Sequence, residues 1–322
     1  MKDIYEGLSL GKATRDAYGE ALVELGRQHE DIVVLDADLA VSTKSAFFGE
    51  EFPDRFLNVG IQEANMVSMA GGLASSGLVP FISSFACFVI LKGFDQLRMS
   101  VAYPNLNVKV VGSHGGITPG EDGSSQQAVE DIALAASLPG FVVCVPSDEH
   151  QTRAAVEAAY RHEGPVYIRT GRPKAPLIYG ETPTDFEFGK ATLLREGTDL
   201  TIIANGMLVG AALVAHERLK AAGIEARVLD MATVKPLDEE AIRRAAAETG
   251  AIITAEEHLL HGGLGSAIAQ VVATSHPVPM EFVGLNDTYA ESGDAGELLV
   301  KYGLTAKEIV EAAERVVERR GS

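Results

Sequence analysis

The sequence predicts an α/β fold of two domains, each with a mostly parallel sheet covered by helices. Short apolar segments alternate with amphipathic segments along the whole chain, and this pattern pauses and restarts near residue 188. Short, continuously apolar strands between helices are typical of parallel sheets that are covered on both faces. The chain also has 322 residues, which is long for one typical domain and sufficient for two.

The first domain is expected over residues 1–187. Residues 13–28 place Ala17, Ala21, Leu22 and Leu25 at helical spacing and predict a helix. A second helix is expected after residue 146, with Ser147 as its N-cap and two acidic residues in its first turn. Strands are expected at 31–39, 106–112, 141–146 and 164–171.

Residues 56–91 form a long segment with Glu63 as its one ionisable side chain. Such a length raises the question of a membrane span. Glycines and a proline interrupt the segment at Gly71, Gly72, Gly77 and Pro80. We therefore expect a helix, a short buried strand and a second helix within a protein interior, and no membrane span.

The second domain is expected over residues 188–322. The segment 172–197 contains three prolines and has no helical period, so we expect it to link the domains. The predicted strands are 199–206, 225–231, 250–258 and 280–285, and the predicted helices are 210–223, 238–250, one following 262–265, and 305–320.

The composition excludes some partners and locations. A net charge of −18 argues against nucleic-acid binding, which requires clustered Lys and Arg. Cys87 and Cys144 lie in apolar segments without metal or redox spacing, and the N-terminus has no apolar signal sequence. These features predict a cytoplasmic protein with reduced, buried cysteines.

Glu63 is the first candidate functional residue. It follows the strand-like "FLNVG" and precedes a helix, and parallel sheets bind ligands beyond the carboxyl ends of their strands. The carboxylate could serve a ligand, or it could stabilise the positive end of the helix. Phe85 and Phe88 could form core or hold a flat heteroaromatic ring. The glycine-rich loop 112–131 has the length and composition of a functional loop.

Five motifs in the first domain resemble the pyrimidine-binding domain of transketolase. They are "DADLAVS", "NVGIQEANM", "FISSFACF", "SHGGITPGEDGSSQQ" and "GPVYIRTGR". In the second domain, "EEHLLHGGLGSAIAQ" and "KYGLTAKEIVEAA" resemble the transketolase C-terminal domain. The chain lacks the "GDG" motif with which full-length transketolases bind the diphosphate of thiamine diphosphate through a metal ion. It therefore resembles the C-terminal subunit of a split transketolase.

The resemblance implies a set of cofactor-binding residues. The glutamate that matches Glu63 hydrogen-bonds a ring nitrogen of the aminopyrimidine in this family and thereby activates the cofactor for proton removal at C-2. Asp38 and Leu39 match residues that line the cofactor site. Phe85 and Phe88 match aromatic residues that flank the pyrimidine, and Leu91 stands where many transketolases have a tyrosine.

The resemblance also implies substrate-binding residues. The residues that match the substrate-phosphate site are Arg15, Ser42, His114 and Arg172, and Arg169 is a weaker match than Arg172. Arginine suits phosphate because its planar guanidinium donates two parallel hydrogen bonds. Asp122 matches the aspartate that contacts the hydroxyl beside the substrate carbonyl. Gln126 replaces the usual histidine, which contacts the carbonyl region, and glutamine cannot titrate.

The implied activity is transfer of a two-carbon ketol unit from a ketose phosphate to an aldose, as in pentose phosphate metabolism. Thiamine diphosphate would be the cofactor, and Mg²⁺ or Ca²⁺ would be bound by a partner subunit carrying the diphosphate-binding domain, with no metal site in this chain. An α2β2 heterotetramer is expected. Two alternatives stay open, namely the β subunit of a thiamine-dependent 2-oxo acid dehydrogenase and a non-catalytic partner with the same fold.

Overall fold

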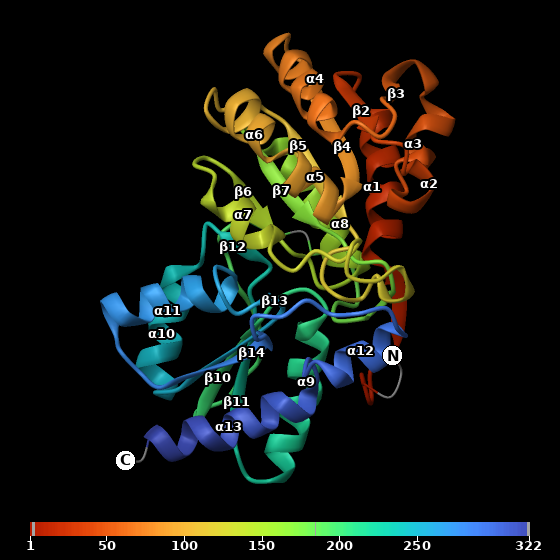
Figure 1. Ribbon diagram of the computed structural model, residues 1–322. Coiled ribbons are helices and arrows are strands. Elements are labelled where there is room, and N and C mark those ends of the chain that lie inside the picture. The colour runs from red at the N-terminus through yellow and green to blue at the C-terminus, as the bar shows by residue number, and fades with distance from the viewer. Residues whose placement is uncertain (2–3, 184, 321–322) are drawn as a thin grey trace.

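Two sheets with their covering helices lie one above the other in the computed structural model, which describes residues 1, 4–183 and 185–320 (Figure 1). The upper sheet has seven strands in the order β12-β6-β7-β5-β4-β2-β3, and the lower sheet has five in the order β14-β13-β10-β11-β9. The predicted fold of two α/β domains is confirmed.

The strands of the upper sheet are parallel except for β12. Their bounds are β2 (Ile32–Asp36), β3 (Phe56–Asn58), β4 (Val79–Phe85), β5 (Lys109–Ser113), β6 (Val142–Cys144), β7 (Val166–Arg169) and β12 (Thr233–Lys235). After β2 the chain adds β3 on one side and then returns to add β4 on the other. The carboxyl ends of β2 and β4 therefore meet at a reversal of strand order, where open α/β sheets bind ligands.

Helices cover both faces of the upper sheet. They are α1 (Thr14–Gln28), α2 (Ala40–Thr43), α3 (Ala46–Glu51), α4 (Glu63–Ser75), α5 (Ala86–Lys92), α6 (Phe94–Gln96), α7 (Asp131–Ser137) and α8 (Glu149–Arg161). Successive strand residues point to opposite faces. Phe81 accordingly packs in the core with α1, α3 and α8, whereas Ile82 packs in the core with α4, α5 and α7.

The lower sheet is parallel except for β9. Its strands are β9 (Thr192–Arg195), β10 (Leu200–Ala204), β11 (Ala226–Asp230), β13 (Ile252–Leu259) and β14 (Met280–Leu285). Its helices are α9 (Leu208–Ala221), α10 (Glu239–Thr249), α11 (Leu264–Ser275), α12 (Ala295–Lys301) and α13 (Ala306–Arg320). One apolar core runs from Ile82 of the upper sheet to Ile203 of the lower sheet, so the domains pack directly on each other.

Two sequence predictions are wrong in detail. Asp148, not Ser147, caps α8, because its side chain accepts from the amide of Gln151. The segment 172–197 is not only a linker. It contains β8 (Lys174–Pro176), which pairs with β1 (Leu10–Ala13), and β9 of the lower sheet.

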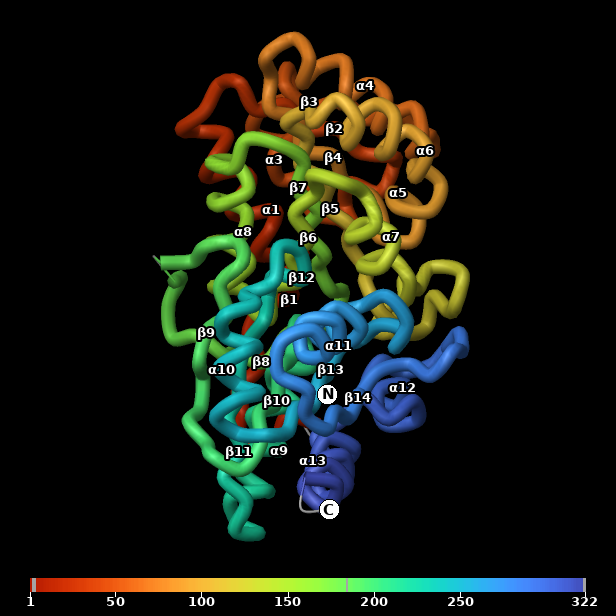
Figure 2. Tube along the Cα trace, turned by 90° about the vertical axis from the view of Figure 1, so that its left-hand side faces the viewer, coloured from red at the N-terminus to blue at the C-terminus, as the bar shows by residue number. Residues whose placement is uncertain are grey.

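The chain crosses between the sheets a second time. Strand β12 follows β11 in sequence, yet it extends the upper sheet beside β6, as Figure 2 shows. The predicted domain boundary between residues 187 and 188 lies between β8 and β9, and it stays a prediction.

Two further expectations concern the environment of the chain. Cys87 and Cys144 are free and buried, as expected. Among the described residues, no helix combines the length and the apolar character that a membrane span requires.

Candidate active site

Most of the candidate residues lie beyond the carboxyl ends of four neighbouring strands, β3, β2, β4 and β5. Asp38 and Leu39 follow β2, Phe85 ends β4, and His114 follows β5. Glu63 begins α4, directly after the loop that leaves β3. Parallel pairing aligns these strand ends, so the fold brings together residues that lie far apart in the sequence.

Glu63 is buried, with 3% of its side chain exposed. The ammonium group of Lys92, at the end of α5, lies 3.5 Å from both carboxylate oxygens. The Lys92 side chain is half exposed, so solvent reaches one side of this ion pair. Lys92 was not predicted from the sequence, although it follows Phe88 by one helical turn.

Phe85 lies at the centre of an aromatic stack. Its ring is nearly parallel to that of Phe88, with centroids 5.6 Å apart, and it stacks on the imidazole of His114 at 3.8 Å. Leu39 packs against the same cluster. The stack therefore joins the predicted cofactor residues to one of the predicted substrate residues.

Two other predicted cofactor residues contribute less to this cluster. Asp38 is exposed and adopts a positive φ of 67°, and its carboxylate accepts from the side-chain amide of Asn58 at 3.1 Å. Leu91 lies on α5 with 42% of its surface exposed. Its predicted packing on a pyrimidine ring stays a prediction.

The turn after β2 is organised by Asp36, which was not among the residues predicted from the sequence. Its buried carboxylate accepts from the amide of Leu39 at 2.6 Å and from the hydroxyls of Thr43 and Ser45, both at 2.8 Å. Burial raises the pKa of Asp36, and these hydrogen bonds oppose the rise. Asp36 thus holds the turn that carries Asp38, Leu39 and Ser42.

Arg15, Ser42 and His114 meet directly. One guanidinium nitrogen of Arg15 donates to the carbonyl of Ser42 at 3.0 Å and to Nε2 of His114 at 3.2 Å. Since arginine only donates, Nε2 of His114 accepts this bond and Nδ1 carries the ring hydrogen. Nδ1 then donates to the hydroxyl oxygen of Ser113, with 2.8 Å between the two atoms. Burial lowers the pKa of His114 to about 3, and Arg15, Arg172 and Lys44 contribute. The imidazole is therefore neutral at physiological pH.

The site is locally cationic although the chain is acidic. Arg172 also acts electrostatically on Arg15: burial lowers the pKa of Arg15, Arg172 adds to this effect, and Asp16 and Asp122 oppose it. Among the residues that the structure describes, the buried Nε atom of Arg15 has no hydrogen-bond partner. An unpaired donor close to several positive charges favours an anion at this position.

Of the remaining substrate candidates, Asp122 and Gln126 lie on the loop after β5, whereas Arg172 follows β7 and contacts that loop. Arg172 donates to the carbonyl of Pro119 and pairs with Glu121 at 2.7 Å. Asp122 is exposed and ends a 3-10 turn, and the side chain of Gln126 accepts from the hydroxyl of Ser125. Arg169 is buried at the domain junction, where its side chain pairs with Asp131 at 3.1 Å and donates to the carbonyl of Glu257.

The residues present fit an aminopyrimidine. The buried carboxylate of Glu63 and the ring of Phe88 share one neighbour, the half-exposed ammonium group of Lys92, and Phe88 lies nearly parallel to Phe85. A flat heterocycle with ring nitrogens could stack there and hydrogen-bond to Glu63. Within residues 1, 4–183 and 185–320, no cluster of three or more His, Cys, Asp or Glu side chains is arranged to hold a metal ion.

Comparison with known proteins agrees with this geometry. Residues 11–176 match the transketolase pyrimidine-binding domain, and residues 189–309 match the transketolase C-terminal domain. The chain is 46% identical to the 6-deoxy-6-sulfo-D-fructose transketolase subunit SqwH of Clostridium sp. (strain MSTE9), over 95% of each chain. It is 39% identical to a subunit of the apulose-4-phosphate transketolase of Phocaeicola vulgatus, over 95% of this chain and 98% of that one.

A solved structure is similar over almost the same length. A split-gene transketolase in the form of an inactive beta4 tetramer superposes with a TM-score of 0.90 at 48% identity, covering 96% of this chain and 99% of that chain. The chain therefore belongs to the transketolase family, of which it carries the pyrimidine-binding and C-terminal domains.

Proposed function

We propose that the chain is the pyrimidine-binding subunit of a two-chain transketolase that moves a two-carbon ketol unit from a ketose phosphate to an aldose or aldose phosphate. The observation that carries the proposal has two parts. The first is the buried carboxylate of Glu63, whose ion-pair partner Lys92 also lies 4.4 Å above the ring of Phe88, which is stacked with Phe85. The second is the cationic group that His114 joins to this stack. The first part suits a heterocyclic cofactor, and the second suits a phosphate.

Glu63 is the proposed catalytic residue. It would hold a proton at a ring nitrogen of the aminopyrimidine, while Phe85 and Phe88, helped by Leu39 and Leu91, would orient the ring and exclude water. A dry surrounding strengthens such a hydrogen bond. Asp38 would line the same site. When bound, thiamine diphosphate supplies the nucleophilic carbon and the electron sink that ketol transfer requires.

Arg15, Arg172 and the neutral His114 would bind the anionic end of the sugar, with Ser42 beside them. Asp122 and Gln126 would face the carbon atoms nearer the carbonyl. Two of the relatives are named for sugars with a phosphate or a sulfonate group. A pair of guanidinium groups can donate hydrogen bonds to either anion. We place phosphorylated sugars first, among them those of pentose phosphate metabolism.

The proposal includes a partner subunit that supplies the diphosphate-binding domain together with Mg²⁺ or Ca²⁺. Two strongly exposed apolar side chains flank the candidate residues in sequence: Val41 (78% exposed) lies two residues after Leu39, and Ile61 (68%) lies two residues before Glu63. Exposed apolar side chains next to a site are typical of a surface that a partner covers. The similar split-gene structure is an inactive beta4 tetramer. We propose an α2β2 assembly, because each site would need one domain from either chain.

The 2-oxo acid dehydrogenase alternative is less well supported. Its substrates carry no phosphate, so the convergence of Arg15 and Arg172 near His114 would have no role there. A non-catalytic role would leave the buried Glu63 only a structural role at the start of α4. A cytoplasmic location is part of the same proposal and agrees with two free, buried cysteines.

The test is reconstitution with a partner chain that carries the "GDG" motif. We expect weak thiamine diphosphate binding by this chain alone in calorimetry with Mg²⁺, tight binding by the pair, and ketol transfer only by the pair. Mass measurement should give two copies of each chain. Tight binding by the isolated chain, or an inactive pair that binds cofactor, would contradict the proposal.

A further inference from the structure

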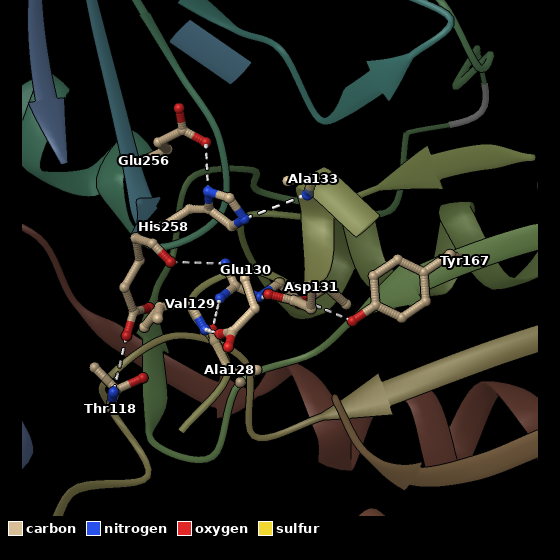
Figure 3. Close-up of polar contacts among 12 residues, drawn as sticks. Thr118, Ala128, Val129, Glu130, Asp131, Ala133, Tyr167, Glu256 and His258 are labelled. Carbon is tan, nitrogen blue, oxygen red and sulfur yellow. Dashed lines mark hydrogen bonds and ion pairs between the residues drawn. The ribbon is translucent and has the colours of Figure 1, made fainter. Parts of the chain in front are cut away.

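The loop that carries three substrate candidates is held by the second domain. It runs from His114 to Ala128 and includes Asp122 and Gln126, and its base is closed by a bridge in which Gly116 and Ala128 exchange hydrogen bonds of 2.7 and 3.1 Å. Figure 3 shows Thr118 and Ala128 of this loop beside the end of β13 that carries Glu256 and His258. The first domain also contacts this loop, through Arg172 at Pro119 and Glu121.

Glu257 makes the central contact. One oxygen of its carboxylate accepts from the backbone amides of Ile117 and Thr118 at 2.7 and 2.8 Å. Both donors are buried, so without Glu257 two backbone N–H groups would lose their partner in a dry environment. A Cβ atom on Gly116 would lie 2.1 Å from the carboxylate, which shows how closely Glu257 approaches the loop.

Arg169 and a nearby segment complete the attachment. Arg169 donates to the carbonyls of Glu257 and Ala128 at 2.9 and 2.6 Å, so it connects β13 to the base of the loop. The side chain of Gln127 donates to the carbonyls of Ile117 and Glu291, both at 3.1 Å.

The neighbouring residue Glu256 differs from Glu257 in the amides that it binds. It is equally buried on the same strand, but its carboxylate accepts from the amides of Leu264 and Gly265, at the start of α11 in its own domain. Glu256 therefore stabilises the second domain without touching the loop. It provides a matched control one residue away.

We propose that Glu257 is a positioning residue for sugar binding: it holds the backbone of the 114–128 loop so that His114, Asp122 and Gln126 face the substrate. The second domain then contributes to specificity without supplying a side chain that contacts substrate. The sugar-binding role rests on the proposed function, whereas the attachment itself does not.

The attachment can be tested on the wild-type chain by amide hydrogen exchange. The amides of Ile117 and Thr118 should exchange as slowly as those of β13, because opening them requires the domains to part. The exposed residues at the tip of the loop, Glu121, Asp122, Ser124 and Ser125, should exchange much faster. If the amides of Ile117 and Thr118 exchange as fast as those of the tip, the inference is wrong. This result is obtained on the wild-type chain and does not depend on the folding of any variant.

Variants of Glu257 then separate the effect of the position of its acceptor oxygen from the effect of its charge. Glu257→Gln keeps the acceptor oxygen at the same distance and removes the charge, whereas Glu257→Asp keeps the charge and withdraws the oxygen by one carbon. We expect exchange at Ile117 and Thr118 to rise about tenfold or more in the Asp variant and to stay close to wild type in the Gln variant. The opposite order would mean that these amides are protected by the charge interaction between Glu257 and Arg169, and not by the hydrogen bonds from the loop to Glu257. Glu256→Gln should leave exchange in the loop unchanged.

In the reconstituted complex, Glu257→Asp should raise KM for a ketose phosphate about tenfold, while the affinity for thiamine diphosphate and the exchange of its C-2 proton stay at wild-type values. The cofactor residues Glu63 and Phe88 lie on other elements, so a change confined to the loop should leave their positions unchanged. An equal loss of cofactor binding would overturn the positioning role. If the wild-type complex transfers no ketol unit at all, the proposed function fails, and the exchange experiment still decides the attachment.

Discussion

The ammonium group of Lys92 lies 3.5 Å from both carboxylate oxygens of Glu63 and 4.4 Å above the ring of Phe88. It thus touches the two surfaces that the proposed function assigns to the aminopyrimidine. A ring that stacks on Phe88 and bonds to Glu63 must displace Lys92 toward solvent, where half of its side chain already lies.

Replacing Lys92 should therefore help the cofactor to bind. Partly exposed ion pairs contribute about 0.2–1 kcal/mol, so Lys92→Met should tighten thiamine diphosphate binding by the assembled pair about twofold to fivefold. Calorimetric titration measures this. Lys92→Arg, which keeps the charge, should bind like the wild type. Weaker binding by the Met variant would show that Lys92 contacts the cofactor instead of competing with it.

Glu63→Gln should leave folding and assembly intact and remove most turnover. The change is nearly isosteric, and a neutral amide is tolerated in a dry site. An amide cannot share a proton with a ring nitrogen, so activity should fall on the order of a hundredfold or more. The assay follows C-2 proton exchange and ketol transfer in the complex, with Glu240→Gln, in the first turn of α10, as control. Proton exchange at the wild-type rate would reduce Glu63 to a structural residue at the start of its helix.

Arg15→Gln should weaken binding of phosphorylated sugars in particular. Loss of a charge-assisted hydrogen bond to phosphate raises KM about tenfold to a hundredfold. KM for the unphosphorylated sugar should change little, which separates anion binding from general damage. The control is Arg153→Gln, since the partly buried Arg153 pairs with Glu20 and Glu24 of α1. Equal losses for both substrates would argue against an anion site at Arg15.

Asp230 makes stability depend on pH. It is fully buried at the end of β11, where it accepts from Ser147, Gln151 and Tyr179. Burial raises its pKa from 3.8 to about 6. The folded protein therefore holds the proton more tightly than the unfolded chain, and a stabilisation present below pH 3.8 is lost as pH rises through about 6. The difference of about two pH units corresponds to about 3 kcal/mol in total.

Asp230→Asn should remove this dependence. Its melting temperature, relative to that of the wild type, should be higher at about pH 7.5 than at about pH 5, by an amount corresponding to about 1–2 kcal/mol. Thermal unfolding at the two pH values measures it, with the exposed Asp54→Asn as control. An identical difference at both pH values would mean that Asp230 does not titrate in this range.

The predictable parts of the fold are those with a strong local signal. Helix α1 is predictable because Ala17, Ala21 and Leu22 recur at helical spacing, and its observed bounds nearly coincide with the prediction. Strands β8 and β12 have three residues each, too few to establish a period of two. They exist because neighbouring strands offer hydrogen-bonding edges, which the local sequence does not reveal.

The site residues also differ in how strong their local sequence signal is. Glu63 is conspicuous in the sequence because it is the one charge in a long uncharged segment, which ends one residue before Lys92. Lys92 is unremarkable in sequence and acquires its role only when α4 and α5 pack together. Glu257 is 140 residues away from Ile117, so no spacing rule could connect the two. The roles assigned to Arg15, Asp122 and Gln126 stay predictions.

Strand β12 limits how this polypeptide can be divided. Its antiparallel pairing of Thr233 with Cys144 and of Lys235 with Val143 covers the outer edge of β6, and Lys235 also donates to the carbonyls of Ala136 and Leu138. A fragment ending at residue 187 would retain every motif of the pyrimidine-binding domain and still expose an apolar strand edge, which invites strand-to-strand association. We expect such a fragment to aggregate, because the edge of β6 that β12 covers in the intact chain would be free to pair with a strand of another molecule.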